Sequence, residues 1–211
     1  MCRDCKIIKY ERKIISFCLG DGSIDNRYRL FIRHCATQKE YIEWKQNEIN
    51  SIIPCSKVTY VNNSGYDSYS IHTNNNICNI KELKDIKDKL YSKDNKKFFS
   101  KEIVDSMDAY CFAILYMDDG SLSSKRRNKQ IYSYDLTISV YGEKEECQNL
   151  IDKLSTLGIK FTLKLNKGKY SIRCGTKNAR KFLSYISKVT PNLSCFKLSK
   201  FRELKTNFTS F

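Results

Sequence analysis

The chain has 211 residues, enough for one domain with a sizeable core or for two small domains. Its 38 Lys and Arg residues outnumber its 23 Asp and Glu residues, and a net charge of +15 favours a polyanionic partner over solubility alone. No long apolar stretch and no strongly basic amphipathic helix is evident, which argues against a membrane as that partner.

The first part of the chain predicts an alternation of helices and strands. The apolar run at 10–20 predicts a helix, and the alternating run at 28–34 predicts a half-buried strand. The elements expected next are a helix at 38–52, strands at 57–61 and 66–72 around the turn signal at 62–65, and a charged helix at 79–91.

The same order of elements restarts near residue 105. An opening helix extends to 119, and a basic loop at 125–129 leads to a strand at 134–140. The remaining elements are a helix at 143–157, a hairpin of strands at 161–166 and 170–174, and a last helix at 176–188. The repeat predicts an α+β protein of two similar halves, residues 1–104 and 105–211.

Each half opens with an apolar helix that ends in an acid followed by glycine. Asp21 precedes Gly22, and Asp119 precedes Gly120 after a further acid, Asp118. Glycine past a helix end is ordinary capping, but a carboxylate there opposes the helix dipole. Either motif alone reads more simply as the start of a turn. Their recurrence in two similar halves of a basic chain instead indicates a cation held by both.

Two carboxylates brought close together repel each other unless a cation neutralises them. Their hard oxygens suit Mg²⁺ better than zinc, and Mn²⁺ is expected to substitute. Such an ion can activate water and stabilise the leaving oxygen of a phosphodiester. Asp21 and Asp119 are therefore candidate metal ligands.

These two segments resemble the paired motifs of the LAGLIDADG homing endonucleases in their single-chain form. The second, Leu115-Tyr116-Met117-Asp118-Asp119-Gly120-Ser121, is close to a common form of the family motif, and the first matches over Leu19-Gly20-Asp21-Gly22. The resemblance implies two pseudo-symmetric αββαββα halves, with the motif helices packed at the centre and the antiparallel sheets forming a DNA-binding saddle.

The resemblance also implies the roles of particular residues. The last acid of each motif, Asp21 and Asp119, would bind the catalytic metal, and Gly20 and Asp118 would offer backbone carbonyls to the same ions. Lys97 and Lys197 match the positions of the basic residues that lie around the scissile phosphates. A cation there can stabilise developing charge or organise the attacking water.

Strand alternation predicts which side chains face the DNA, because successive residues of a strand point to opposite faces. Arginines there can read guanine, whereas many lysines contact only phosphate. The predicted DNA-binding residues are Arg29, Arg33, Lys57, Thr59, Tyr69, Lys125, Arg126, Arg127, Asp135, Thr137, Ser139, Thr162, Lys164, Asn166, Ser171 and Arg173. His34 and His72 are interpreted as strand residues rather than metal ligands.

The resemblance implies a monomeric, metal-dependent endonuclease that cuts double-stranded DNA at a long target site. It would cut across the minor groove and leave 3′ overhangs. One alternative is an RNA maturase that assists splicing of its host intron on the same scaffold. Another is a DNA-binding protein with an inactive site, which the two intact acids disfavour.

The cysteines bear on the compartment. Five of the ten occupy apolar patterns, as small buried hydrophobes do: Cys18, Cys111, Cys147, Cys174 and Cys195. The start of the chain lacks the apolar core of a secretory signal. We therefore expect a reducing interior, in an organelle such as a mitochondrion or plastid, or in a bacterial or phage host.

Overall fold

The computed structural model describes residues 3–63, 65–74, 77–140, 142–191 and 193. It forms two compact units, one built on Met1–Lys96 and the other on Lys97–Thr190. The division falls before the boundary expected after residue 104. The reason is that the backbone around Phe99 is bonded to the second unit: its N–H donates to Glu146 Oε1 at 2.7 Å and its carbonyl accepts from Asn149.

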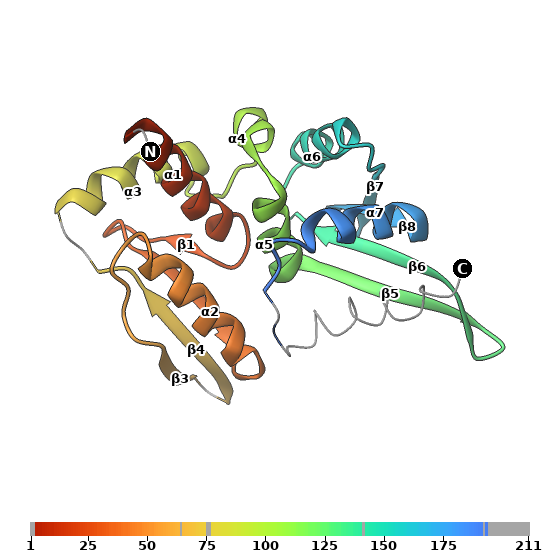
Figure 1. Cartoon of the computed structure of the whole chain (residues 1–211), viewed down its shortest axis with the longest axis horizontal. Coiled ribbons are helices and arrows are strands. Elements are labelled where there is room, and N and C mark those ends of the chain that lie inside the picture. The colour runs from red at the N-terminus through yellow and green to blue at the C-terminus, as the bar shows by residue number, and fades with distance from the viewer. Residues whose placement is uncertain (1–2, 64, 75–76, 141, 192, 194–211) are drawn as a thin grey trace. The chain divides into compact units, whose positions relative to one another are not determined.

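The first unit follows the order α-β-β-α-β-β-α (Figure 1). Its short 3₁₀ helix η1 leads directly into α2. The elements are α1 (Arg3–Leu19), β1 (Ser23–Ile24), β2 (Leu30–Cys35), η1 (Ala36–Gln38), α2 (Lys39–Asn50), β3 (Thr59–Asn63), β4 (Tyr66–His72) and α3 (Ile77–Leu90).

The second unit repeats this order after one additional short helix, α4 (Figure 1). Both units are therefore α+β, as predicted. The elements are α4 (Lys101–Ser106), α5 (Ala109–Asp119), β5 (Gly120–Arg127), β6 (Gln130–Ser139), α6 (Lys144–Thr156), β7 (Thr162–Asn166), β8 (Lys169–Gly175) and α7 (Thr176–Ile186).

Each unit contains one antiparallel four-stranded sheet, and the two sheets have equivalent strand orders. The order is β1-β2-β4-β3 in the first unit and β5-β6-β8-β7 in the second. In both, the strand that follows the motif helix lies at one edge, and the second hairpin supplies the other edge. The matching topology confirms the repeat that the element order predicted.

The helix expected from 105 to 119 is in fact two helices. α4 ends at Ser106, and Met107 adopts an extended conformation. Asp108 then starts α5, because its carboxylate accepts hydrogen bonds from the backbone N–H groups of Tyr110 and Cys111. The break separates the motif helix from the segment that connects the units.

The basic loop expected at 125–129 is the end of a hairpin. Strands β5 and β6 pair along their length, with a register shift between Lys125 and Arg126. Asn128 and Lys129 adopt positive φ values of 51° and 64°, which closes the hairpin in two residues. Near the turn of the β7–β8 hairpin, Leu165 is 60% exposed.

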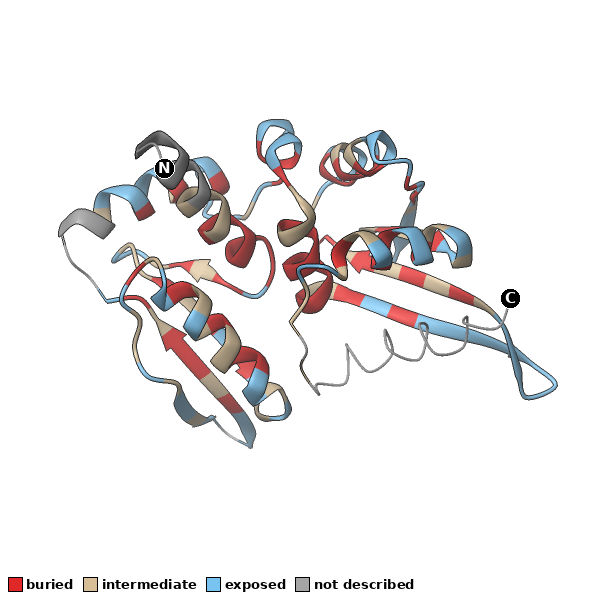
Figure 2. Ribbon diagram, viewed as in Figure 1, coloured by how far each residue is buried: buried red, intermediate tan, exposed pale blue. Residues whose placement is uncertain are grey.

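The core of the second unit lies between α5, α7 and one face of the sheet. Phe182 of α7 makes edge-on contacts with the rings of Phe112, Tyr116 and Phe161, at centroid distances of 6.3, 5.7 and 5.5 Å. Figure 2 shows buried residues alternating along β5 and β6, and an exposed far end of this hairpin. The sheet therefore keeps one face free of the core.

Across the part of the chain that the structure describes, none of the helices combines the length and apolarity needed to span a bilayer.

Replacing Gly120 by Ser is expected to destabilise the protein by about 1–3 kcal/mol. A Cβ atom there would lie 2.4 Å from the carbonyl oxygen of Tyr116 and 2.1 Å from its ring, so the helix-to-strand turn would have to open. Gly175→Ser is the control, because its Cβ meets nothing within 4 Å and serine suits the N-cap of α7. Urea unfolding curves of the two variants should separate; equal midpoints would contradict the packing argument.

Candidate functional site

In the first unit, a tight turn connects the end of α1 to β1 and carries Asp21. The N–H of Gly22 donates to the carbonyl of Phe17 at 3.0 Å. A Cβ on Gly22 would lie 2.5 Å from that oxygen, so only glycine allows this approach. Gly20 is buried, whereas the side chain of Asp21 is 39% exposed. The turn therefore presents a carboxylate at the C-terminal end of a buried helix.

The second unit has an equivalent turn at the end of α5. The N–H of Gly120 donates to the carbonyl of Tyr116, four residues back, whereas Gly22 bonds five residues back. The helix continues through both acids. Asp118 is buried at 5% exposure and Asp119 is half-buried. Each predicted acid thus occupies the position between an apolar helix and an edge strand.

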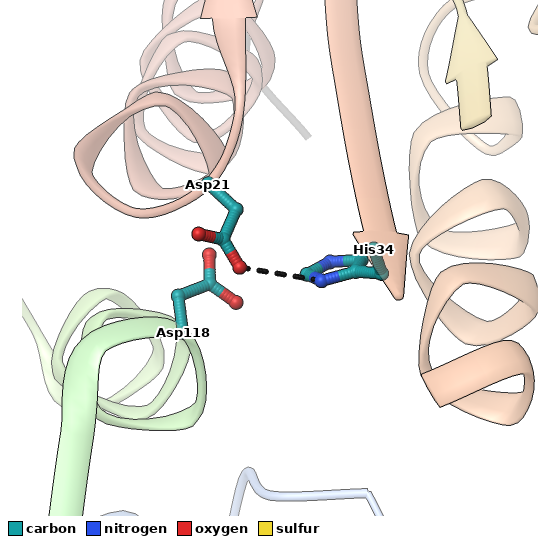
Figure 3. A group of neighbouring side chains, drawn as sticks. All are labelled: Asp21, His34 and Asp118. Carbon is teal, nitrogen blue, oxygen red and sulfur yellow. Dashed lines mark ion pairs between the residues drawn. The ribbon is translucent and has the colours of Figure 1, made fainter. Parts of the chain in front are cut away.

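His34 is an ionic partner of Asp21 within the first unit. Its Nδ1 lies 3.2 Å from Asp21 Oδ2, as the dashed line in Figure 3 marks, and 3.1 Å from Gln38 Oε1. The histidine is on β2 and Gln38 is the last residue of η1. A proton on Nδ1 serves both acceptors and restrains the orientation of the Asp21 carboxylate.

The His34 ring is almost fully buried, with a side-chain exposure of 1%, and packs on Tyr41 at a centroid distance of 4.8 Å. Its Nε2 has no hydrogen-bond partner among the described residues. A proton on Nε2 would leave a buried donor unsatisfied, so the structure favours a proton on Nδ1.

The sequence interpretation of His34 as a plain strand residue missed this contact. The feature of the sequence that indicates a buried His34 is its position in the alternating strand. In the alternating run, His34 follows Leu30 and Ile32 on the core face, and a histidine in a core register is buried and needs a polar partner.

Of the two predicted lysines, Lys97 belongs to the part of the chain that the structure describes. Lys97 is half-buried and begins the second unit, directly after a turn in which Ser92 and Lys96 exchange backbone and side-chain hydrogen bonds. Lys197 lies outside the described residues. Lys97 thus lies at the start of the second unit, a few residues before α4 and the motif helix that follows it.

The open face of the second sheet carries the polar residues that strand alternation predicted to point outward. The register joins Ser121, Thr137, Arg173 and Thr162 in one row across the four strands. Other rows of the same face contain Asp135, Ser139, Ser171, Lys164 and Asn166. Leu136, Ile138 and Ile172 fill the opposite, buried face.

The end of the β5–β6 hairpin is strongly basic. Lys125, Arg126 and Arg127 are all exposed, and Lys129 follows at the turn. Ile131 and Tyr132 are exposed beside them, at 37% and 65%. This end of the second unit combines cationic and apolar side chains.

In the first sheet, the register separates the predicted residues. Arg33 pairs with Ser70, and Ser70 pairs with Thr59, so these three share the face opposite the core. Tyr69 pairs with His34 and lies on the other face, where its ring contacts Lys39 and Tyr60. The prediction that Tyr69 faces the DNA is therefore wrong, because its register is that of the core.

Two further residues of the first unit lie outside the strands. Arg29 is half-buried and its guanidinium bonds Asp25, with Nε to Oδ2 at 2.9 Å, which closes the turn between β1 and β2. The pKa of Asp25 is lowered because its hydrogen bonds from the Arg29 and Arg27 backbone and from the Arg29 side chain outweigh the opposing effect of burial. Lys57 is exposed just before β3.

These features match a known family. The model of the LAGLIDADG DNA endonuclease family matches residues 14–182, and the chain belongs to this family. The match covers both helix-acid-glycine turns and both sheets, which confirms the resemblance inferred from the sequence.

Solved structures share the fold over nearly the whole chain. The homing endonuclease I-WcaI, solved bound to its DNA recognition sequence, has a TM-score of 0.69 at 22% identity, covering 92% of this chain and 86% of that one. I-DmoI, solved in complex with DNA and Ca, has a TM-score of 0.53 at 13% identity, covering 94% and 99%. Identities this low show the fold alone.

A curated relative matches part of the chain. Protein RecA of Mycobacterium shimoidei is 30% identical over 123 residues, which are 56% of this chain and 27% of that protein. The matched segment thus spans about a quarter of the length of that protein.

The buried histidine gives a direct test of the site geometry. In ¹H–¹⁵N spectra of the ring nitrogens, Nδ1 of His34 should show the shift of a protonated nitrogen. His72 is the other histidine of the chain, so a His72→Gln variant assigns the signals. An Nδ1 without a proton would contradict the contact with Asp21.

Proposed function

We propose that the chain is a metal-dependent endonuclease that hydrolyses both strands of a DNA duplex at a specific site. One arrangement, found in each unit, carries the proposal. A helix ends at a carboxylate, a glycine follows it in a tight turn, and the chain continues into a sheet with an open polar face. Family membership and a net charge of +15 support DNA as the substrate.

The donor atoms at the helix ends fit a hard divalent cation. Asp21 offers an exposed carboxylate beside the last carbonyl groups of α1, and such oxygen donors suit Mg²⁺ or Mn²⁺. Asp119, at the end of α5, offers the same chemistry. The residues proposed to hold the metal are the side chains of Asp21 and Asp119 with the backbone oxygens of Gly20 and Asp118.

A divalent cation at these acids supplies Lewis-acid chemistry, because it lowers the pKa of water and neutralises charge on the phosphodiester. Asp21 and Asp119 would hold the cation at the C-terminal ends of helices, where the helix dipole otherwise disfavours a negative group. His34 orients the carboxylate of Asp21. Lys97 and Lys197 are proposed to stabilise charge on the scissile phosphates.

The open sheet faces are proposed to bind the DNA. Arginines and hydroxyl or amide side chains of the second sheet would contact base edges, and the basic hairpin end would contact phosphates. Arg33 and Thr59 are the equivalent candidates in the first sheet, where they share one face. Because this chain carries both motifs, we propose a monomer that cuts across the minor groove and leaves 3′ overhangs.

Replacing Asp119 by Asn, or Asp21 by Asn, is expected to abolish cleavage while leaving DNA binding largely intact. Asparagine keeps the shape of the side chain but cannot supply the charge that the metal requires. The loss should exceed the roughly 10- to 100-fold that removal of an outer-shell partner of a metal costs. The assay is cleavage with Mg²⁺ of a duplex selected from a randomised library, with binding measured separately in Ca²⁺.

Asp152→Asn is the matched control, because Asp152 is exposed on α6 and its hydrogen bond from Gln148 can be kept by asparagine. Its cleavage rate should equal that of the wild type. Undiminished cutting by either motif variant would refute the proposed metal site.

DNA affinity is expected to fall at least about tenfold between 50 and 200 mM salt, because cations on the protein displace counterions from phosphates. Replacing Lys125, Arg126 and Arg127 by Ala should flatten the slope of log affinity against log salt by roughly one unit for each phosphate that is no longer neutralised. Lys84→Ala, an exposed lysine on α3, should leave the slope unchanged. Fluorescence anisotropy measures both, and a salt-independent affinity would contradict the electrostatic account.

A further inference from the structure

On the open face of the second sheet, one carboxylate lies between two cations. Arg173 Nη2 is 2.6 Å from Asp135 Oδ2, and Lys125 Nζ is 2.9 Å from the same oxygen. Asp135 is on β6, with Lys125 on the neighbouring strand β5 and Arg173 on β8. Its side chain is 16% exposed, against 37% for Arg173 and 46% for Lys125.

The register explains why these three side chains meet. Asp135 pairs with Ser123 on one side and Gly175 on the other, so Lys125 and Arg173 are its diagonal neighbours on the same face. Glycine at 175 leaves no side chain directly opposite Asp135. The guanidinium of Arg173 reaches the carboxylate from its diagonal position.

An anion on a face that binds DNA would by itself repel phosphates. The hydrogen bond from Arg173 lowers the pKa of Asp135, and Lys125 acts in the same direction, so the carboxylate stays charged at neutral pH. Isolated surface ion pairs contribute little to stability. Stabilisation of the fold is therefore not enough to explain an acid at this position.

The arrangement has a specific consequence for Arg173. A guanidinium is planar and carries five N–H donors, and a carboxylate bonded to one nitrogen restrains the plane and leaves other donors open. A restrained arginine loses less conformational freedom when it donates two parallel hydrogen bonds to O6 and N7 of guanine.

We propose that Asp135 is a positioning residue that makes Arg173 a reader of one guanine in the target. The inference rests on the proposed DNA-binding function and adds the specificity of one position within it. Arg173 makes the base contact, Asp135 sets its orientation, and Lys125 shares the carboxylate from the opposite side.

The test is selection of bound duplexes from a randomised library, carried out with the full chain and its variants in Ca²⁺. The wild type should enrich guanine at a position that Arg173→Ala no longer enriches. One bidentate contact predicts roughly 5- to 150-fold discrimination at that position. Asp135→Asn should reduce this preference at least about threefold while leaving the preferences at the other positions unchanged.

A second readout separates positioning from a merely structural role. Asp135→Asn removes a negative charge from the binding face, so its affinity for unrelated DNA should stay equal or rise. A variant that only disturbs the fold would lose affinity for all duplexes and unfold at a lower temperature. Asp105→Asn is the control, because it removes an acid paired with Lys101 on α4, away from the sheet.

The outcomes distinguish this inference from the function on which it rests. Ordinary enrichment with the same guanine preference in wild type and Asp135→Asn would overturn the inference alone. A general loss of affinity together with a lower melting temperature would also overturn it, in favour of a structural role. No enrichment of any duplex by the wild type would overturn both proposals.

Discussion

The close contact between a glycine and a helix carbonyl is the constraint on which the rest of the structure depends. In each unit the chain turns from a buried helix into an edge strand so tightly that a Cβ atom has no room. The turn fixes the preceding carboxylate at the negative end of a helix, where it is disfavoured unless a cation compensates it. One local geometry therefore links the fold of each unit to its proposed chemistry.

The two turns are similar but not identical. Gly22 reaches back five residues and Gly120 four, so α5 continues through two acids while α1 stops before its single one. Asp21 also has a buried histidine partner, His34, within its unit. The repeat thus preserves the position of the acid relative to helix and strand, while the surroundings of each acid differ.

The sheets illustrate how one surface can combine affinity and specificity. Cations at an exposed hairpin end attract a polyanion without regard to sequence, whereas side chains in the rows of the sheet face have defined neighbours. The Asp135 carboxylate lowers the net positive charge of its face and in return restrains Arg173. A weaker attraction to phosphates combined with a better oriented arginine is expected where binding must discriminate between DNA sequences.

The sequence by itself determined the repeated order of most elements, the two motif turns and the alternation that gives each sheet an open face, but it indicated neither β1 nor β5 nor the break between α4 and α5. These follow from local periodicity and from Gly22 and Gly120, whose missing side chains allow the chain to pass close to a helix carbonyl. Tertiary structure alone decided that Tyr69 lies on the core side and that Asp135 is shared by two cations. Both depend on strand register, which pairs residues that are distant in sequence.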